Sequence, residues 1–422
     1  MVRVSKKVTP AVRDTVIEKT IEVIRSQYAY PEQGTRIADA IQEKMASGRY
    51  SDLTTVSDFC SALDDDLYKV SQDRHLGVLY SPEEAARLRG LPPGDEDPDG
   101  WFAQFRIDNF GLVRAEYMSG NVGYLRIDVF APLSLAKNAA ISMMECISNC
   151  DALIIDVRNN GGGDPYLVQL IESFFFEGKP KLLLTFYKRK SDGPEQIYTI
   201  PHLPGKRLDT VPLYILTSRR TFSGAEDFSY TLKHHGRALV VGEPTGGGAN
   251  TIDDKVLHDD FVIYIPSGYP THPKTGKNWE GIGVEPDIAV ASEKALGVAH
   301  VHALQTLIEK SSDEERVRRL NFELERVRAA YSRVDVPREK LSKYVGTYGE
   351  YYVDLRDSAL TVLSRKDDRI CWRLVAISET LFAVENDEYN VRFDVDASGR
   401  AISLAFVHWK QDRENAIGRT DG

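Results

Sequence analysis

Apolar residues recur at helical spacing along the first seventy residues or so of the chain. Ile17, Ile21 and Ile24 follow Thr9-Pro10, a pair that is typical of a helix start, so a first helix is predicted there. Two more stripes predict a second helix that stops near Gly48 and then a third helix; they consist of Ile37, Ile41 and Met45, and of Val56, Cys60, Leu63, Leu67 and Val70. Residues 1–85 are therefore predicted to form an N-terminal helical domain.

After this domain the pattern changes to apolar runs that alternate with amphipathic segments. Residues 91–100, LPPGDEDPDG, have the composition of a linker. The predicted strands are NVGYLRIDVF, DALIIDVR, KLLLTFY, PLYILTS, ALVVGE and FVIYIP. DALIIDVR is apolar without a break, as expected for a strand that is buried on both faces. Because helical segments separate several of these strands, residues 100–310 are predicted to form an α/β layer fold.

The last quarter of the chain has a third pattern. Residues 312–331 are charged and amphipathic, and they predict a helix that links two domains across 311–335. From 336 to 422, short apolar runs such as ALTVLS, ICWRLVA and VRFDV alternate with turn residues. This pattern predicts a C-terminal antiparallel β domain or small barrel.

Composition excludes several classes of protein. The chain has 422 residues, of which 42% are hydrophobic and 27% charged, so long disorder is not expected. Its net charge is −10 and it has no basic run, which argues against nucleic-acid binding. There is no apolar stretch of transmembrane length. The N-terminus as written is not a signal peptide, so a cytoplasmic location is expected, or a secreted or periplasmic one if a signal was removed.

The four cysteines are Cys60, Cys146, Cys150 and Cys371. Cys146 and Cys150 are four residues apart on a predicted helix and would share a face. With no histidine or further cysteine nearby to complete a metal site, the cysteines are predicted to be small buried residues. No metal and no cofactor is expected.

Ser223 follows the apolar strand PLYILT and precedes a predicted helix. A serine in this setting is most often a helix cap, and Glu226 three residues later would complete a capping box. The same position suits a nucleophile, because a helix N-terminus offers unpaired N–H groups where an oxyanion develops.

A second candidate element is the glycine-rich segment Asn159-Asn160-Gly161-Gly162-Gly163, which follows the strand DALIIDVR. It lacks the spacing of a dinucleotide fingerprint and the Lys-Ser/Thr of a P-loop, so nucleotide binding is poorly supported. It could be a plain tight turn, or its N–H groups could supply an oxyanion donor.

A base for Ser223 cannot be chosen from the residues alone. His234 and His235 lie at the far end of the helix that Ser223 opens, about 18 Å away, which is out of reach. Seven other histidines remain candidates for the base: His75, His202, His258, His272, His300, His302 and His408.

Residues 122–290 resemble the tail-specific or C-terminal-processing protease family, which has a crotonase-like fold. The resemblance is carried by NVGYLRI, DALIIDVRNNGGG, PLYILTSRRTFSGAEDF, GRALVVGEPTGGG and EGIGVEPDIAV, in the family's order. One branch of the family uses a Ser-Lys pair, and the match places Gly248 where that lysine would stand. The tricorn-like branch uses a histidine from a motif similar to Asp-Gly-His, which matches Asp73-Arg74-His75, and an acidic residue that matches Glu280.

The resemblance implies a cofactor-free serine peptidase with Ser223 as nucleophile, His75 as base and Glu280 as the acidic member. Gly224 and either Gly162 or Gly163 would then donate to the oxyanion. The implied fold is α/β, a crotonase-like core between the helical domain and a lipocalin-like β domain. Peptide or protein substrates are expected, and a homo-oligomer is possible.

Two other functions remain open. The layout also resembles the repeats of interphotoreceptor retinoid-binding protein, so a non-catalytic binder of retinoid-like or other apolar ligands is the main alternative. An acyl hydrolase acting on esters is a third hypothesis, which the fold and triad would not distinguish.

Overall fold

The chain divides into two compact units in a computed structural model that describes residues 6–90, 100–332, 334–367, 369, 371–410 and 415–421. The first unit comprises Met1–Glu116, Tyr124–Asn149 and Ile155–Ser292, and the second comprises Tyr117–Gly123, Cys150–Ile154 and Glu293–Gly422. Most of the predicted linker, residues 91–99, lies outside the described residues. Across the described ranges, none of the helices is long and apolar enough to cross a membrane.

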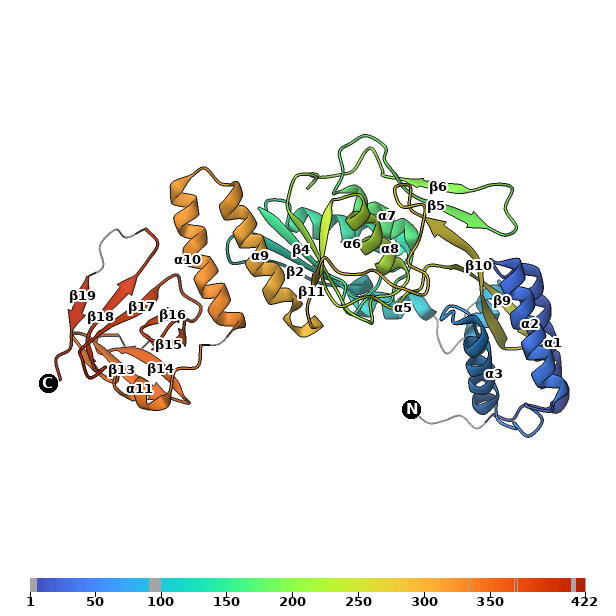
Figure 1. Cartoon of the computed structure of the whole chain (residues 1–422), viewed down its shortest axis with the longest axis horizontal. Helices are drawn as coiled ribbons and strands as arrows, with labels where there is room; N and C mark the ends of the chain where they lie inside the picture. The colour runs from blue at the N-terminus through green and yellow to red at the C-terminus, as the bar shows by residue number, and fades with distance from the viewer. Residues whose placement is uncertain are drawn as a thin grey trace. The chain divides into compact units, whose positions relative to one another are not determined.

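The first unit begins with the three predicted helices, α1 (Pro10–Gln27), α2 (Pro31–Ala46) and α3 (Val56–Ser71). Thr9 caps α1, since its hydroxyl accepts from the Val12 amide at 3.3 Å. The apolar stripes of the helices share one core with strands β9 (Thr251–His258) and β10 (Phe261–Thr271), so the helices lie against these strands (Figure 1).

A short strand that the sequence pattern did not predict, β1 (Gly77–Tyr80), joins the helical region to a sheet. It pairs antiparallel with β10, with Gly77 opposite Tyr264. The carboxylate of Asp64 in α3 also accepts from the Val78 amide at 2.6 Å. In the same sheet β10 pairs with β9 and with β5 (Leu182–Lys188), and β5 pairs with β6 (Glu195–Tyr198). The residues just before β1 are therefore held at a defined place on this sheet.

A second sheet has the order β11 (Ile288–Ala289), β8 (Ala238–Gly242), β7 (Leu213–Thr217), β4 (Ala152–Asp156), β3 (Val122–Ile127) and β2 (Leu112–Met118). The β7–β8 and β8–β11 pairs are parallel. Every residue of β4 and β7 is buried, which agrees with their unbroken apolar runs.

Three helices lie beside this second sheet (Figure 1), namely α6 (Leu133–Cys146), α7 (Pro165–Ser173) and α8 (Gly224–His234). Earlier in the chain, α4 (Pro82–Leu88), α5 (Gly100–Ile107) and the 3₁₀ turn Asn109–Gly111 precede β2. The mixed α/β architecture predicted for this region is confirmed.

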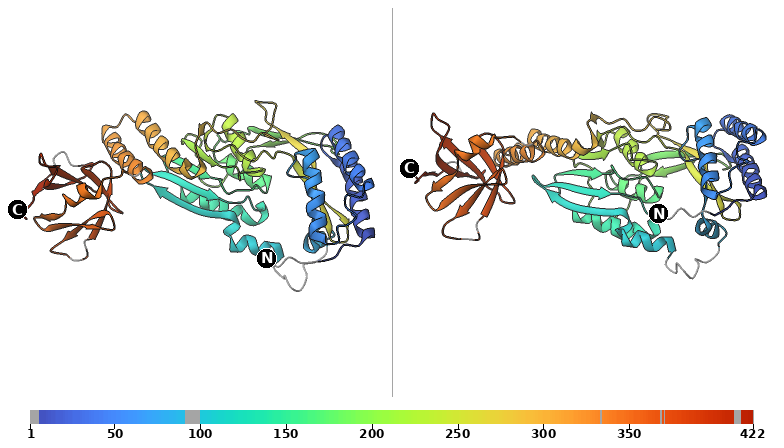
Figure 2. Two further views of the ribbon diagram at one scale, coloured as in Figure 1. Left: turned by 60° about the horizontal axis from the view of Figure 1, so that its bottom comes forward. Right: turned by 90° about the horizontal axis from the view of Figure 1, so that it is seen from below.

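The longest segment of the second unit, Glu293–Gly422, contains two long helices. The sequence pattern did not predict α9 (Ala295–Lys310), but it did predict α10 (Glu314–Tyr331). After α11 (Arg338–Ser342) an antiparallel sheet runs in chain order through β12 (Gly346–Tyr348), β13 (Tyr351–Arg356), β14 (Ala359–Ser364), β15 (Cys371–Ala376), β16 (Leu381–Val384), β17 (Asn390–Val395), β18 (Ala401–Val407) and β19 (Ala416–Gly418). A bridge between Tyr348 and Arg419 nearly closes the sheet into a barrel (Figure 2). The predicted C-terminal antiparallel β domain is confirmed.

The cysteine prediction was wrong in part. Cys150 is buried, but Cys146 and Cys371 are exposed. Helix α6 ends at Cys146, so Cys150 lies beyond the helix and does not continue its face.

Candidate active site

Ser223 stands between β7 and α8 in a backbone conformation that glycine usually takes. Its φ is 52° and its ψ is −119°. For a residue with a Cβ such a conformation costs about 1–3 kcal/mol, and it persists where the surroundings impose it. One such restraint is the hydrogen bond from the Phe222 amide to the Asn160 carbonyl, at 3.0 Å. The serine is thus held in a strained turn at a helix N-terminus.

The segment Asn160–Gly163, here called the glycine turn, lies directly against Ser223. A Cβ built on Gly162 would lie 2.8 Å from the Ser223 Cβ, so a side chain has no room there. Gly162 and Gly163 have φ values of 108° and 135°, which also require glycine. The buried Asn160 side chain fixes the turn, because its amide group donates to the Ile127 carbonyl and its oxygen accepts from the Gly162 amide.

Two backbone N–H groups near Ser223 are available to a ligand. A Cβ built on Gly224 would lie 3.2 Å from the Gly163 nitrogen, so these two glycines are neighbours. Within the described part of the chain, neither the Gly163 nor the Gly224 N–H donates a hydrogen bond. The Gly162 N–H, by contrast, is already bonded to Asn160 at 2.8 Å. Of the two predicted alternatives, Gly163 therefore offers the free donor.

His75 lies beside the residue that precedes Ser223. The centroids of the His75 and Phe222 rings are 4.7 Å apart, and the His75 side chain is 8% exposed. Neither ring nitrogen has a hydrogen-bond partner among the described residues. Burial lowers the pKa of His75, and the nearby Asp73 charge acts in the opposite direction. A lowered pKa favours the neutral imidazole, which is the form that can accept a proton.

The segment Thr245–Asn250, here called the glycine loop, packs against these rings at Gly248. A Cβ built on Gly248 would lie 2.2 Å from Phe222 Cζ and 2.7 Å from His75 Cε1. The Phe222 and His75 rings thus fill the space that a side chain at position 248 would need, and position 248 is the one matched to the lysine of the Ser-Lys branch.

Glu226 connects the Ser223 turn to the glycine loop. Its buried carboxylate accepts from the backbone amides of Ser223 at 2.9 Å, Gly247 at 2.7 Å and Gly248 at 2.8 Å, and from the Thr245 hydroxyl. Burial raises the pKa of Glu226, and these donors offset that effect. The predicted capping-box residue therefore also anchors a second segment of the site.

We expect Glu226→Gln to slow the reaction of Ser223 with a fluorophosphonate by about 100-fold and to cost about 3 kcal/mol of folding free energy. The side-chain amide would turn N–H groups toward donors that now bond to the carboxylate, so the turn and the loop would lose their shared anchor. The rate of labelling and urea unfolding measure the two effects. Glu177→Gln, at an exposed position, is the matched control, and equal behaviour of the two variants would contradict this role.

Among the described residues, no hydrogen bond or ion pair joins Glu280 to His75. Its carboxylate accepts from the Ala249 amide at 2.6 Å and the Asn250 amide at 3.0 Å, both in the glycine loop. The carboxylate that contacts the His75 ring is that of Asp73, with Oδ1 3.8 Å from Nδ1. Glu280 is therefore bound to the backbone of the glycine loop.

The sequence did not predict that Asp73 contacts the His75 ring or that Glu226 binds the glycine loop. Asp73 was noted as the first residue of Asp-Arg-His and Glu226 as a capping partner. The available signal was the same in both cases, namely a carboxylate two or three residues from a proposed catalytic side chain.

A histidine cluster lies at the C-terminal end of α8, away from the Ser223 end. The His235 and His272 rings are 4.6 Å apart, and those of His234 and His272 are 5.7 Å apart. Burial, assisted by Lys181 and Lys274, lowers the pKa of His235 to about 4. Burial and the two neighbouring histidines lower the pKa of His272 to about 3.

Because both pKa values in the folded state lie below the unfolded value of about 6.5, this cluster should lose stabilising free energy as the pH falls from about 6.5 toward 4. Buried carboxyls with raised pKa values, such as Asp227 at about 7, act in the opposite direction. Replacing His272 with glutamine removes one histidine of this cluster. We therefore expect the free energy of unfolding of His272→Gln, relative to that of the unmodified chain, to rise by about 1 kcal/mol as the pH falls from 7 to 5. Urea unfolding of both proteins at the two pH values measures this difference; no change in it would contradict the argument.

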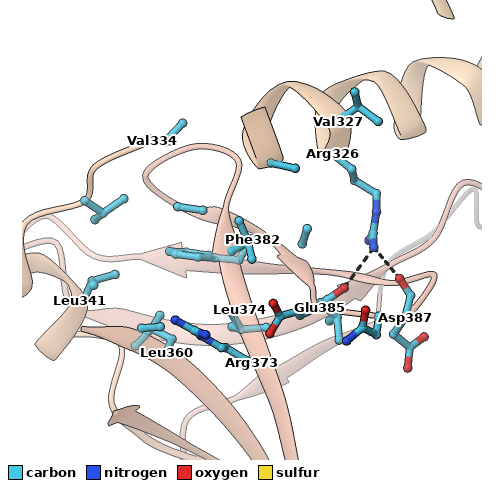
Figure 3. A pocket seen from close by; sticks show the side chains of 18 of the residues that line it. Arg326, Val327, Val334, Leu341, Leu360, Arg373, Leu374, Phe382, Glu385 and Asp387 are labelled. Carbon is cyan, nitrogen blue, oxygen red and sulfur yellow. Dashed lines mark hydrogen bonds between the residues drawn. The ribbon is translucent and has the colours of Figure 1, made fainter. Parts of the chain in front are cut away.

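A cavity belongs to the second unit, whereas Ser223 and His75 belong to the first. Its volume is about 970 Å³, and α10 and strands of the β domain line it (Figure 3). Arg326 of α10 donates to the carbonyls of Tyr389 at 2.7 Å and Val384 at 3.0 Å. The lining combines apolar side chains such as Phe382 with charged ones such as Arg373 (Figure 3).

Among the described residues there is no group of three or more His, Cys, Asp or Glu side chains that could hold a metal ion.

Two family models match the chain. Peptidase family S41 matches residues 121–290, and the N-terminal domain of Peptidase_S41 in eukaryotic IRBP matches residues 8–100. Together the two matched ranges contain the predicted Ser223, His75 and Glu280 and both glycine segments.

Two relatives each match 40% of the chain. Carboxyl-terminal-processing peptidase 2, chloroplastic, from Arabidopsis thaliana is 29% identical over 176 residues, which is 40% of this chain and 32% of that protein. Carboxy-terminal processing protease CtpB from Bacillus subtilis is 27% identical over 180 residues, which is 40% of this chain and 34% of that protein. The chain therefore spans about a third of the length of these relatives. The crystal structure of a putative peptidase from Parabacteroides merdae is similar with a TM-score of 0.48 and 20% identity, covering 69% of this chain and 96% of that one.

Proposed function

We propose that the chain is a serine peptidase of family S41, whose model matches residues 121–290, and that Ser223 attacks the carbonyl carbon of a peptide bond. The observation that carries this proposal is the strained Ser223 turn, with free N–H groups on Gly163 and Gly224 beside it. A helix cap needs neither a positive φ nor two unpaired amides at its side. Strain of this kind is typical of a functional residue.

His75 is the proposed general base. It takes the Ser223 hydroxyl proton as the new C–O bond forms, and it returns the proton to the leaving amine when the C–N bond breaks. The contact of its ring with the Phe222 ring and its lowered pKa support this role. In the present arrangement the His75 ring nitrogens have no hydrogen bond to the described residues, so a small ring rotation accompanies substrate binding.

The Gly163 and Gly224 N–H groups are the proposed oxyanion hole. They would hold the negative oxygen of the tetrahedral intermediate, at the N-terminus of α8, where the helix dipole adds to the stabilisation. Losing one such donor costs about 3 kcal/mol in the transition state. Glu280, the acidic member predicted from the sequence, is proposed to act in the site through the Ala249 and Asn250 amides that it binds.

The finer fold assignments are also proposals. We propose that residues 100–310 form a crotonase-like core, preceded by a helical domain at 1–85, and that 311–335 link it to a lipocalin-like β domain at 336–422. The parallel β7–β8–β11 strands with α8 support the first assignment, and the nearly closed antiparallel sheet supports the last.

Peptides or proteins are the proposed substrates. The relatives named above are carboxyl-terminal-processing peptidases, so peptides with a free C-terminus are the first substrates to test. Assembly of several copies of this chain into a homo-oligomer is also proposed.

The alternative is a non-catalytic binder of retinoid-like or other apolar ligands. The cavity beside α10 is the observation that bears on it, and its lining includes charged Arg373 and Glu385 beside apolar Phe382. Such a binder has no need of a strained serine, a free pair of amides and a buried imidazole in one place. An ester-hydrolysing enzyme would share all three, so ester and peptide substrates must be compared directly.

Labelling with a fluorophosphonate tests the proposal. We expect a single adduct on Ser223, located by peptide mass spectrometry, and no adduct in Ser223→Ala. A matched control is Ser191→Ala, on an exposed turn, which should label normally. An unlabelled Ser223 in the folded protein, together with peptide turnover that survives in Ser223→Ala, would refute the assignment.

A further inference from the structure

A buried polar cluster surrounds Asp73, two residues before His75. The Asp73 side chain is 2% exposed, and both of its oxygens are bound. Oδ2 accepts from the Tyr28 hydroxyl at 3.0 Å and from the Asn250 side-chain amide at 2.9 Å, and Oδ1 accepts from the backbone amide of His75 at 2.9 Å. The carboxylate is therefore held in one orientation by three elements of the first unit.

The same Oδ1 lies 3.8 Å from Nδ1 of the His75 ring. This separation is longer than a hydrogen bond, but Nδ1 has no other partner among the described residues. A modest rotation of the ring toward Oδ1 would close the gap, and active-site hydrogen bonds often tighten in this way when substrate binds. Because both side chains are buried, a positive charge on the imidazole would interact with Asp73 much more strongly than in water.

Glu280 is placed differently. Its Oε2 is already used by the Ala249 and Asn250 amides. Burial, and then the charge of Asp73, raises the pKa of Glu280 to about 7, so near neutral pH this carboxyl carries a proton much of the time. A partly neutral group that is bound to the glycine loop is a weak counter-ion for an imidazolium.

We propose that Asp73, rather than Glu280, is the carboxylate that orients the His75 ring and stabilises its cation, and that Glu280 positions the glycine loop. This inference rests on the proposed function, in which His75 is the base. In the acylation step the Ser223 oxygen bonds to the carbonyl carbon, the carbonyl π electrons move to oxygen, and the hydroxyl proton moves to Nε2 of His75. The Nδ1 proton stays on the ring in a hydrogen bond to the Asp73 carboxylate. The Nε2 proton then passes to the leaving amine as the carbonyl re-forms and the C–N bond breaks.

The test compares Asp73→Asn with Glu280→Gln. Both replacements keep the shape of the side chain, and in Glu280→Gln the remaining side-chain oxygen can still accept from the two loop amides. We expect Asp73→Asn to lower kcat by about 10³-fold with little change in KM, and Glu280→Gln to lower kcat by only about 10-fold, through a less firmly held glycine loop.

A second readout separates orientation of the ring from a purely structural role. The pKa of His75 is followed by NMR through its ring protons in each variant. We expect it to fall in Asp73→Asn, because the charge that raises it is removed, and to change less in Glu280→Gln. A larger fall in Glu280→Gln, no fall in Asp73→Asn, or equal losses of kcat in the two variants would overturn the assignment.

The same titration distinguishes failure of this inference from failure of the proposed function. It needs no turnover, and it is repeated in a Ser223→Ala background. If Ser223 does not label and no peptide is cleaved, the peptidase proposal fails while the response of His75 to Asp73→Asn still decides which carboxylate faces the ring.

Discussion

Replacing His75 with alanine is expected to lower kcat for peptide hydrolysis by about 10⁴-fold or more, with a small effect on KM. The reason is that the ring is the one proposed proton acceptor for Ser223, and it has a lowered pKa beside Phe222. The residual rate would come from the oxyanion donors and from binding alone. Steady-state kinetics with a fluorogenic peptide, and the rate of fluorophosphonate labelling, measure the loss.

His202→Ala is the matched control for this prediction, because His202 is exposed and lies outside the site. It should leave kcat unchanged. If His75→Ala keeps more than about a tenth of the activity, a different group is the base, and the proposed mechanism is wrong.

The second large effect is expected at Gly248. Gly248→Ala should lower kcat by about 10³-fold, since its methyl group would overlap the Phe222 and His75 rings and displace the imidazole. Gly248→Lys should be at least as damaging and should not restore activity through a Ser-Lys pair, because the lysine would have to displace the same rings. Kinetics of both variants, with unfolding measured in parallel, test this.

Gly193→Ala is the control for glycine replacement, since nothing lies within 4 Å of a Cβ built there. If the loss in Gly248→Ala is steric, Phe222→Leu should partly restore it, so that the double variant is more active than the product of the single effects predicts. Independent effects, or full activity in Gly248→Ala, would show that the contact does not govern the site.

Much of the fold could be read from the sequence because its signals are local. The stripes of α1, α2 and α3 and the apolar runs of β4 and β7 each show within a window of some fifteen residues. Strand β1 could not be read in this way. Its four residues become a strand through pairing with β10, which lies far along the chain, and no local pattern records such a pairing.

The candidate site shows the same limit. Ser223 and the glycine turn were recognisable, because a strand, a turn and a helix start follow one another in the sequence. The choice of Gly163 over Gly162 depends on where the Asn160 side chain points, and the contact between Asp73 and His75 depends on a ring orientation. Both are properties of folded side chains, for which residue spacing carries no information.

The antiparallel pairing of β1 with β10 has a consequence for how the enzyme is assembled. The proposed base arrives on the segment that leaves the helical region, and the proposed nucleophile arrives on the β7–α8 turn. Neither part contains the whole proposed site by itself, so the site forms only when β1 is paired with β10. A covalent inhibitor whose reaction needs both groups would therefore label only chains in which the two parts are folded together. The labelled fraction would measure correct folding as well as catalytic activity.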